Sequence, residues 1–386
     1  MIRFKLHAWF YFAGVFIGFG ACVLAGHGLS RTTRFDNYVR MYLPIQPQMQ
    51  YYPSPYQLVN TASELYGPGT TLVIVGGSSI FRGTGQNASD LWSTRLQADL
   101  GNSYTVVNFS IDQQWMESFG AVLFRILRQR YDNVIYVGLA AETGAGPIDG
   151  LATYKYFFWD AYYSDLLRLT DHDQEIAIAL KAAELASPSG AELHVGSWLE
   201  GKLRFRVLWN EVGYRLFFPI WTSEAADHPF RPRDQYIDVP DPSPSTTQRR
   251  VRENVEFHNG MKGRLSELVD AFMDPSRPSK LKEPMAASIR KGYDDAFSAG
   301  MRSKILTVFL QPNPEYTHLL PDNKRNAPRD LAVRASEITR DLGYRTIVVG
   351  ETLLPDDYID HAHLMASGGY KLAHEVAEEV RAMSRQ

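Results

Sequence analysis

The stretch that decides the fold is Thr71-Leu-Val-Ile-Val-Gly-Gly-Ser-Ser-Ile-Phe-Arg-Gly83. Its first five residues form a short, mostly apolar run, which predicts a fully buried strand, and the two glycines that follow predict a tight turn. A serine after such a turn is exposed at the end of the strand, where amides at the start of the next helix can hold an oxyanion. Taken alone, the pattern is more often a Gly-Ser turn whose serine caps a helix.

Strand and helix patterns alternate outward from this stretch. Further strands are expected at residues 104–108, 133–138, 304–310 and 345–349, and helices at 87–101, 115–130, 330–342 and 369–384. Alternation with buried, β-branched strands predicts an α/β fold with an open parallel sheet of about five strands, covered by helices on both faces. In such sheets the sites lie at the carboxyl ends of the strands.

Composition divides the chain further. The Tyr- and Gln-rich sequence around Pro44, Pro47, Pro53 and Pro55 predicts that residues 31–70 form an irregular or extended stalk. Residues 71–386 are expected to form the α/β domain. Within it, residues 150–303 have one clear strand signal, at 191–195, and a long Pro-, Asp- and Ser-rich loop at 223–249. We therefore expect an inserted helical cap or subdomain there.

The N-terminal segment indicates a membrane. No Asp, Glu, Lys or Arg occurs from Leu6 to Ser30, and about 20 apolar residues suffice to cross a bilayer. Arg3 and Lys5 precede the run, which favours a cytoplasmic N-terminus. Residues 1–30 are thus predicted to be an uncleaved transmembrane anchor, with a cleaved signal peptide or a buried helix as alternatives.

Overall composition excludes several classes of protein. The formal net charge of -3 over 386 residues gives no sign of a nucleic-acid footprint. A single cysteine, Cys22, excludes an intrachain disulfide and a cysteine-based metal cluster.

A second block that can carry chemistry lies near the C-terminus, in the sequence Asp357-Tyr-Ile-Asp-His-Ala-His-Leu-Met-Ala-Ser-Gly-Gly-Tyr370. An Asp and a His three residues apart, Asp360 and His363, can face one site. The His can take a proton from a serine, and the Asp can fix its tautomer and stabilise the imidazolium. Alone, this pair could equally cap a helix or bind a metal.

Together the two blocks resemble the SGNH/GDSL hydrolase family, in its divergent, membrane-anchored bacterial envelope form. Gly77-Ser-Ser-Ile-Phe-Arg-Gly83 is similar to the family's first block, with Ser78 in place of Asp, and Asp360-His-Ala-His-Leu364 is similar to its last. The resemblance implies a flavodoxin-like sheet and a triad of Ser79, Asp360 and His363. Ser78 and His361 are the alternatives for nucleophile and base.

The middle blocks depart from the family pattern. After the second strand, Asn108 is kept but no glycine follows, and the third strand runs into Gly138-Leu-Ala-Ala-Glu142 without the family's Asn. The candidates for oxyanion donors are therefore the Ser79 amide, Ser110, Asn108 and Gln113. Losing one such donor typically costs about 100- to 1000-fold in rate.

The resemblance implies a serine esterase or O-acyltransferase that acts on an acylated carbohydrate or lipid, without cofactor or metal. It also implies a single-pass protein of the bacterial cytoplasmic membrane, with its catalytic domain on the periplasmic or extracellular side. The alternative is a non-catalytic SGNH-like subunit or scaffold of a larger membrane protein complex, and this would need a membrane protein partner.

An aromatic and basic stretch, Trp198 to Trp221, allows three interpretations. It could pack into the core, lie on a membrane surface, where basic and aromatic residues are favoured, or form a lid over an acyl chain or a sugar. The sequence leaves these open.

Overall fold

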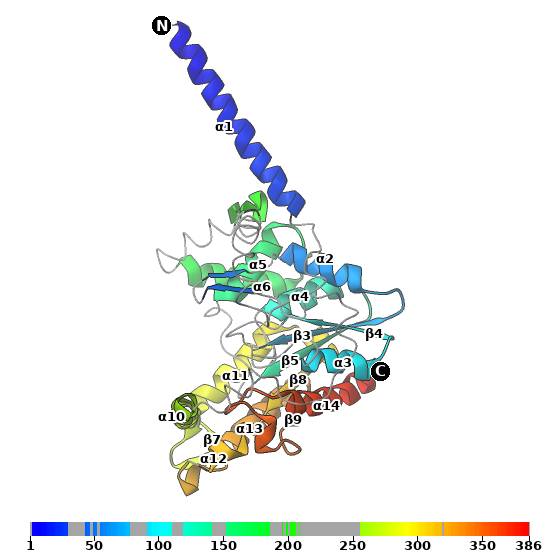
Figure 1. Ribbon diagram of the computed structural model, residues 1–386, viewed down its shortest axis with the longest axis vertical. Coiled ribbons are helices and arrows are strands. Elements are labelled where there is room, and N and C mark those ends of the chain that lie inside the picture. Colours follow the sequence, from blue (N-terminus) through cyan, green and yellow to red (C-terminus); the bar gives the residue numbers. More distant parts are fainter. Residues whose placement is uncertain are drawn as a thin grey trace.

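The centre of the computed structural model is a five-stranded parallel sheet (Figure 1). The structure describes residues 2–29, 43–46, 49–51, 55–77, 91–109, 119–140, 152–185, 195, 198–199, 201–205, 208, 255–318 and 320–385. The strands are β3 (Thr71–Gly77), β4 (Tyr104–Asn108), β5 (Val134–Ala140), β8 (Ile305–Leu310) and β9 (Arg345–Val349). Their spatial order is β4-β3-β5-β8-β9, and every neighbouring pair is parallel. Counted along the chain this order is 2-1-3-4-5, that of flavodoxin-like folds, so the expected α/β fold with a five-stranded parallel sheet is confirmed.

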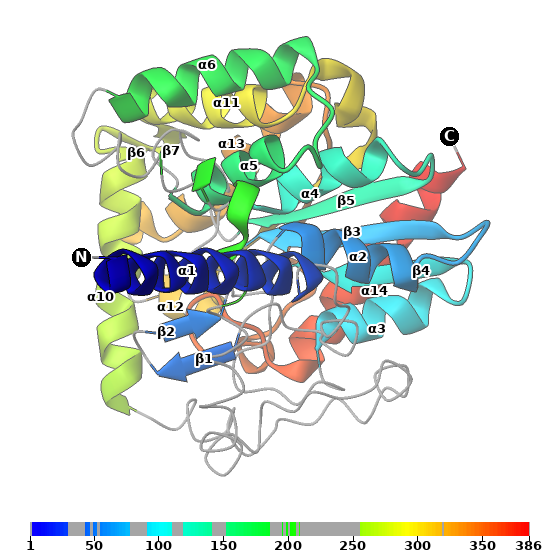
Figure 2. The ribbon, with the colours of Figure 1, turned by 90° about the horizontal axis from the view of Figure 1, so that it is seen from above.

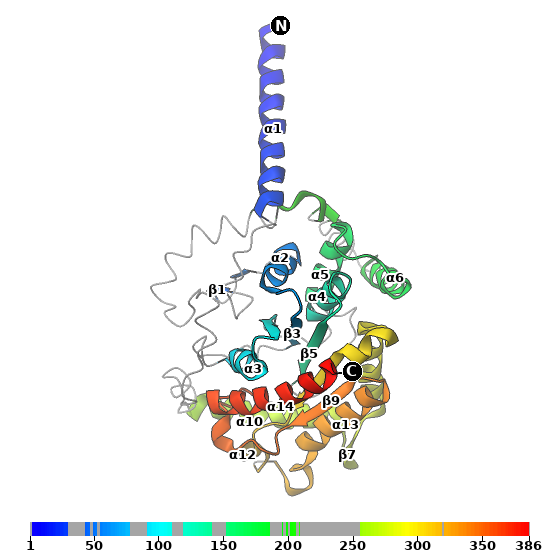
Figure 3. The ribbon, with the colours of Figure 1, turned by 90° about the vertical axis from the view of Figure 1, so that its right-hand side faces the viewer.

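Helices cover both faces of the sheet because successive strand residues point to opposite sides. In β3, Val73 and Val75 join a core with α3 and α14, which lie side by side in Figures 1 and 3. Leu72 and Ile74 point into the larger core on the other face, with α2, α4 and α13. The flanking helices are α2 (Pro55–Leu65), α3 (Trp92–Leu100), α4 (Phe119–Arg128), α13 (Ala327–Asp341) and α14 (Ala366–Ser384).

The prediction of an irregular stalk is wrong for residues 55–65. These residues form α2, which starts at Pro55 and buries Leu58, Val59 and Ala62 in the main core. Proline is tolerated at the first turn of a helix, where its missing N–H would be unpaired anyway, so it marks the start of a helix here. Just before α2, β1 (Leu43–Gln46) and β2 (Met49–Tyr51) form an antiparallel pair. Figure 2 shows α2 beside the end of α1.

The insertion after β5 is helical, as expected, but its described helices are not a separate cap. Of these helices, α5 (Ala152–Tyr163), α6 (Asp171–Leu185) and α11 (Glu283–Ala296) pack into the main core. The longer α10 (Val255–Phe272) packs with α13 in a smaller cluster, and is followed by a hairpin of β6 (Met273–Asp274) and β7 (Arg277–Leu281) that the sequence did not predict. The expected loop at 223–249 and residues 191–194 of the expected strand lie outside the described residues.

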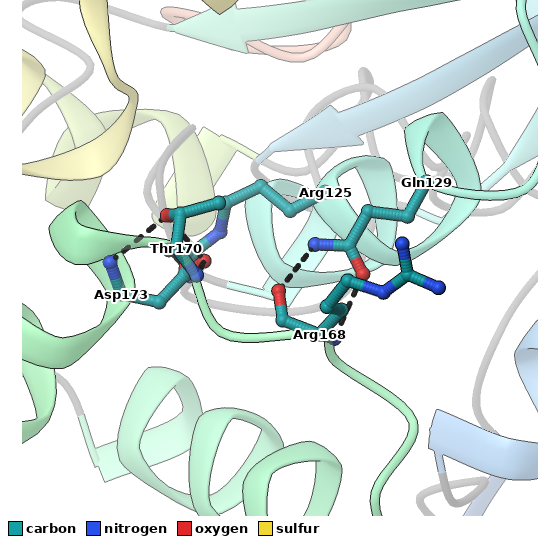
Figure 4. A network of polar contacts seen from close by, with 5 residues as sticks. All are labelled: Arg125, Gln129, Arg168, Thr170 and Asp173. Atoms are coloured by element: carbon teal, nitrogen blue, oxygen red, sulfur yellow. Dashed lines mark hydrogen bonds and ion pairs between the residues drawn. The ribbon is translucent and has the colours of Figure 1, made fainter.

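A polar network ties the start of the insertion to α4 (Figure 4). The buried Arg125 Nη1 lies 2.6 Å from Asp173 Oδ1. Thr170 donates its hydroxyl to Asp173 Oδ2 at 2.7 Å and accepts from the Asp173 amide at 3.2 Å, in the manner of a capping box at the start of α6. Gln129 exchanges two hydrogen bonds with the backbone of Arg168. The α5–α6 connection is therefore fixed to the helix that leads into β5.

The N-terminal helix α1 (Ile2–Leu29) projects away from the domain (Figures 1 and 3). Its segment Trp9–Leu29 is long and apolar enough to cross a membrane, and 6% of its most apolar window is buried. A buried core helix is therefore excluded among the alternatives.

Candidate functional site

Asp360 and His363 form a hydrogen-bonded pair within one tight turn. His363 Nδ1 lies 2.6 Å from Asp360 Oδ2, while Asp360 Oδ1 accepts from the backbone amides of Ala362 at 2.8 Å and His363 at 2.7 Å. The turn is closed by a bond of 2.7 Å from the Ile359 amide to the His363 carbonyl. One carboxylate oxygen thus holds the turn, and the other is left for the imidazole.

The environment keeps Asp360 charged. Its side chain is 2% exposed and that of His363 is 26% exposed. Burial disfavours the carboxylate, but the hydrogen bond and positive charge of His363, with a further contribution from His361, outweigh it and hold the pKa of Asp360 well below its usual range. An ionised carboxylate only accepts hydrogen bonds, so Nδ1 carries a proton, and Nε2 is the ring atom that can accept one when the imidazole is neutral.

Contacts from the end of β8 hold this turn in place. The Asn313 amide donates to the His361 carbonyl at 2.8 Å, and its side-chain Nδ2 donates to the Asp360 carbonyl at 3.1 Å. The Tyr358 hydroxyl donates to the Gln311 carbonyl at 2.8 Å. The turn is therefore fixed to the carboxyl edge of the sheet, where α/β sites are expected. Asn313 is 47 residues away from Asp360 and gave no signal in the sequence.

Geometry distinguishes His363 from His361 as the partner of Asp360. His361 Nδ1 lies 3.6 Å from Asp360 Oδ1, which is beyond normal hydrogen-bond length, and its ring lies against Tyr316 with centroids 6.5 Å apart. His363 makes the short bond and is the more exposed ring.

A second buried carboxylate, that of Asp357, lies beside this turn. Asp356 is exposed, but Asp357 is buried, accepts from the Leu354 amide at 2.8 Å and pairs with Lys371 Nζ at 2.7 Å. Burial opposes its charge, yet the amide and the ammonium lower the pKa of Asp357 below its usual range. Asp357 therefore joins the turn to α14, a structural role that spacing alone did not reveal.

The segment with the candidate nucleophile is bounded by described residues on both sides. β3 ends at Gly77 and α3 begins at Trp92, while Ser78 and Ser79 lie outside the described residues. A Cβ added at Gly369, near the start of α14, would lie 3.2 Å from Trp92 Cβ, so the first turns of α3 and α14 touch. Both helices follow sheet strands, so both begin at the carboxyl edge, and the Asp360–His363 turn lies at the edge where the Ser79 segment starts and ends.

Gly76, in the first block, has a packing role. A Cβ built on Gly76 would lie 2.7 Å from Tyr136 Cε2 and 2.8 Å from Cζ, and one built on Gly120 would lie 2.8 Å and 3.0 Å from the same two atoms. Tyr136 is fully buried in β5. The first glycine of the pair is thus required by a tyrosine on the neighbouring strand, which the motif did not indicate.

Only one of the oxyanion candidates has a described side chain. Asn108 is buried at the end of β4, and its Nδ2 donates to Ser93 Oγ of α3 at 3.0 Å. This bond commits one of its two N–H groups to joining β4 and α3. Ser110, Gln113 and the Ser79 amide lie outside the described residues.

Comparisons with known proteins add no relative to this picture. No protein-family model, curated protein or solved structure matches the chain. The features that indicate a function are therefore the Asp360–His363 pair and its position at the carboxyl edge of the sheet.

Proposed function

We propose that this protein is a membrane-anchored SGNH-type serine esterase or O-acyltransferase, with Ser79 as nucleophile, His363 as base and Asp360 as the residue that orients it. The observation that carries the proposal is the 2.6 Å bond between His363 Nδ1 and the buried Asp360 carboxylate at the carboxyl edge of the sheet. The substrate class is an ester of an envelope or secreted glycan or lipid.

A purely structural role explains this pair less well. Two backbone amides on Asp360 Oδ1 already hold the turn, so the bond from Oδ2 to the ring is additional. It joins a buried acid to a partly exposed base. That arrangement lets the imidazole exchange a proton while the carboxylate stabilises the imidazolium, as in serine hydrolases.

The reaction would proceed in two steps. Ser79 Oγ attacks the ester carbonyl carbon, and its proton moves to His363 Nε2. The tetrahedral intermediate collapses as the imidazolium gives this proton to the oxygen of the departing alcohol. The alcohol is released, and the acyl group stays bonded to Ser79 Oγ. Water or an acceptor hydroxyl then attacks the acyl carbon with His363 again taking the proton, and Ser79 regains a proton as the acid or new ester departs.

The alternative is a non-catalytic SGNH-like subunit or scaffold of a larger membrane protein complex. Two observations favour it. The chain after β5 lacks the family's Asn in Ala140-Ala-Glu142, and the Asn108 amide is engaged with Ser93. A missing oxyanion donor would slow acyl transfer even with the other groups in place.

A fluorophosphonate probe on the full-length, detergent-solubilised protein tests the proposal. We expect labelling of the wild type and of the matched controls Ser78→Ala and His361→Ala, and no labelling of Ser79→Ala. His363→Ala should lose labelling too, and Asp360→Asn should slow it by up to about 10⁴-fold, because the ring would be held in the wrong tautomer. Labelling that persists in Ser79→Ala would exclude this nucleophile, and a folded wild type that is never labelled would favour the non-catalytic subunit.

A further inference from the structure

The C-terminal half of α1 packs against residues 201–205 of the insertion. The rings of Phe19 and Phe205 meet edge to face with centroids 5.3 Å apart. His27 Nε2 lies 2.9 Å from the Lys202 carbonyl, and a Cβ added at Gly26 would lie 2.5 Å from the Arg204 carbonyl oxygen. Figures 1 and 3 show this segment beside the end of α1. The helix is thus docked on the domain, although the sequence predicted a stalk between them.

Arg204 is the joint between helix and domain. Its backbone touches Gly26, while its buried guanidinium forms an ion pair with the buried Asp160 of α5 and lies over the Tyr56 ring of α2, 4.7 Å from the centroid. Its φ of 60° is unfavourable for a residue other than glycine, so the surrounding contacts maintain it. The joint therefore fixes the orientation of α1 relative to the sheet.

The docked segment lies alongside the apolar span. An α-helix rises about 1.5 Å per residue, so Phe19 lies about 12 Å along the axis from His27. If His27 is at the membrane surface, Phe205 beside Phe19 lies below the headgroups. Interfacial segments typically enter the bilayer by about 5–10 Å.

Exposed apolar side chains precede this contact in the chain. Val195 is 55% exposed, Trp198 47% and Leu199 41%. Among the described residues outside α1, they are three of the five exposed large hydrophobic side chains, the others being Ile178 and Leu354. Tryptophan is enriched where membrane meets water, because its ring is amphipathic.

We infer that Val195, Trp198, Leu199 and residues 201–205 form a membrane-interface segment, with Val195, Trp198, Leu199 and Phe205 in the outer part of the leaflet from which α1 emerges. The occupant of this surface is the phospholipid bilayer itself, because the surface is continuous with the apolar span of α1 through the contact of Phe19 with Phe205. The α/β domain is then held against the membrane in one orientation. This inference requires α1 to cross a membrane and does not depend on catalysis by Ser79.

Depth-dependent quenching in the full-length protein tests this inference. Cys22→Ser removes the single native cysteine, and Trp198→Cys or Leu199→Cys then takes an environment-sensitive NBD label. Ile178→Cys on α6 is the matched control, because Ile178 is apolar and 70% exposed. The variants are reconstituted alone into phosphatidylcholine–phosphatidylglycerol vesicles with spin-labelled lipid, and a thermal melt of each confirms that it folds.

We expect labels at 198 and 199 to be quenched severalfold more strongly than the label at 178, and more by a shallow spin label at acyl carbon 5 than by a deep one at carbon 12. Their emission should also shift to the blue. Labels at 198 and 199 that are open to aqueous iodide and as insensitive to the lipid quencher as the label at 178 would overturn the inference, and would point to a protein as the occupant. Strong quenching of all three positions would overturn it as well, because no specific segment would then be in contact.

Discussion

Replacement of Gly76 by alanine tests whether the first block is shaped by packing. The added Cβ would lie within 2.8 Å of Tyr136 Cε2 and Cζ, far inside normal contact distance. The ring cannot easily move, since the ring centroids of Phe124 and Phe297 lie 5.8 Å and 5.7 Å from that of Tyr136, and Gly120 also lies close against it. Overpacking of this kind costs about 1–3 kcal/mol.

A double-mutant cycle combines Gly76→Ala with Tyr136→Leu. Leucine is chosen because it lacks the hydroxyl, Cε2 and Cζ atoms that the new methyl group would meet. Alone it leaves a cavity and destabilises the protein. In that background Gly76→Ala should become neutral or even stabilising, by up to about 1 kcal/mol, because alanine loses less backbone entropy than glycine in a strand. The sign of the Gly76→Ala effect should thus change, with a coupling free energy of about 1–3 kcal/mol.

Thermal and denaturant unfolding of the four proteins measures this cycle. In domains of about 150–250 residues, each kcal/mol shifts Tm by roughly 2–4 °C. Gly263→Ala on α10 is the control, since no atom lies within 4 Å of a Cβ built there, and we expect no loss of stability from it. If Gly76→Ala lowers the free energy of unfolding by the same amount in the wild type and in the Tyr136→Leu variant, the steric explanation is refuted and the glycine is required for another reason.

Two further predictions concern buried charge near α6. Asp173→Ala takes the carboxylate away from the buried Arg125 and should destabilise the protein by about 3–5 kcal/mol. Glu351→Ala breaks a surface pair with Arg329 and should cost less than about 1 kcal/mol, and denaturant midpoints that are equal for the two variants would contradict this contrast. Burial, and then the charge of Arg125, lower the pKa of His172 in the folded protein. Below about pH 6.5 the unfolded chain therefore binds more protons than the folded one, so the free energy of unfolding should decrease as the pH is lowered. His172→Gln should weaken this fall in unfolding measured at pH 7.5 and pH 5.5, and an unchanged or steeper fall would show that other groups cause it.

The sheet could be predicted because its signals are local. A buried parallel strand is a short apolar, β-branched run, and the runs at β4, β8 and β9 match the structure to within one residue. Helix α2 was missed because its evidence is tertiary. Its apolar residues are few and follow several prolines, and only burial against the main core shows that they form a helix.

The candidate site divides in the same way. Asp360 and His363 are three residues apart, so spacing was enough to pair them. Asn313 supports Asp360 from 47 positions away in the chain. Arg204 and Asp160, which form the joint with α1, are 44 positions apart. No local pattern specifies such contacts, because they depend on how the strands and helices are arranged in space.

The buried charged pairs also separate structure from chemistry. Asp160 and Asp173 each pair with a buried arginine, and a guanidinium does not give up its proton in proteins. Those pairs hold a fixed charge and can only stabilise or position. Asp360 pairs with His363, an imidazole that can take up and release a proton and whose ring is more exposed than either arginine. Of these three buried carboxylates, only Asp360 has a partner that can gain and lose a proton during a reaction, which is why this pair, and neither of the shielded ones, is the candidate for catalysis.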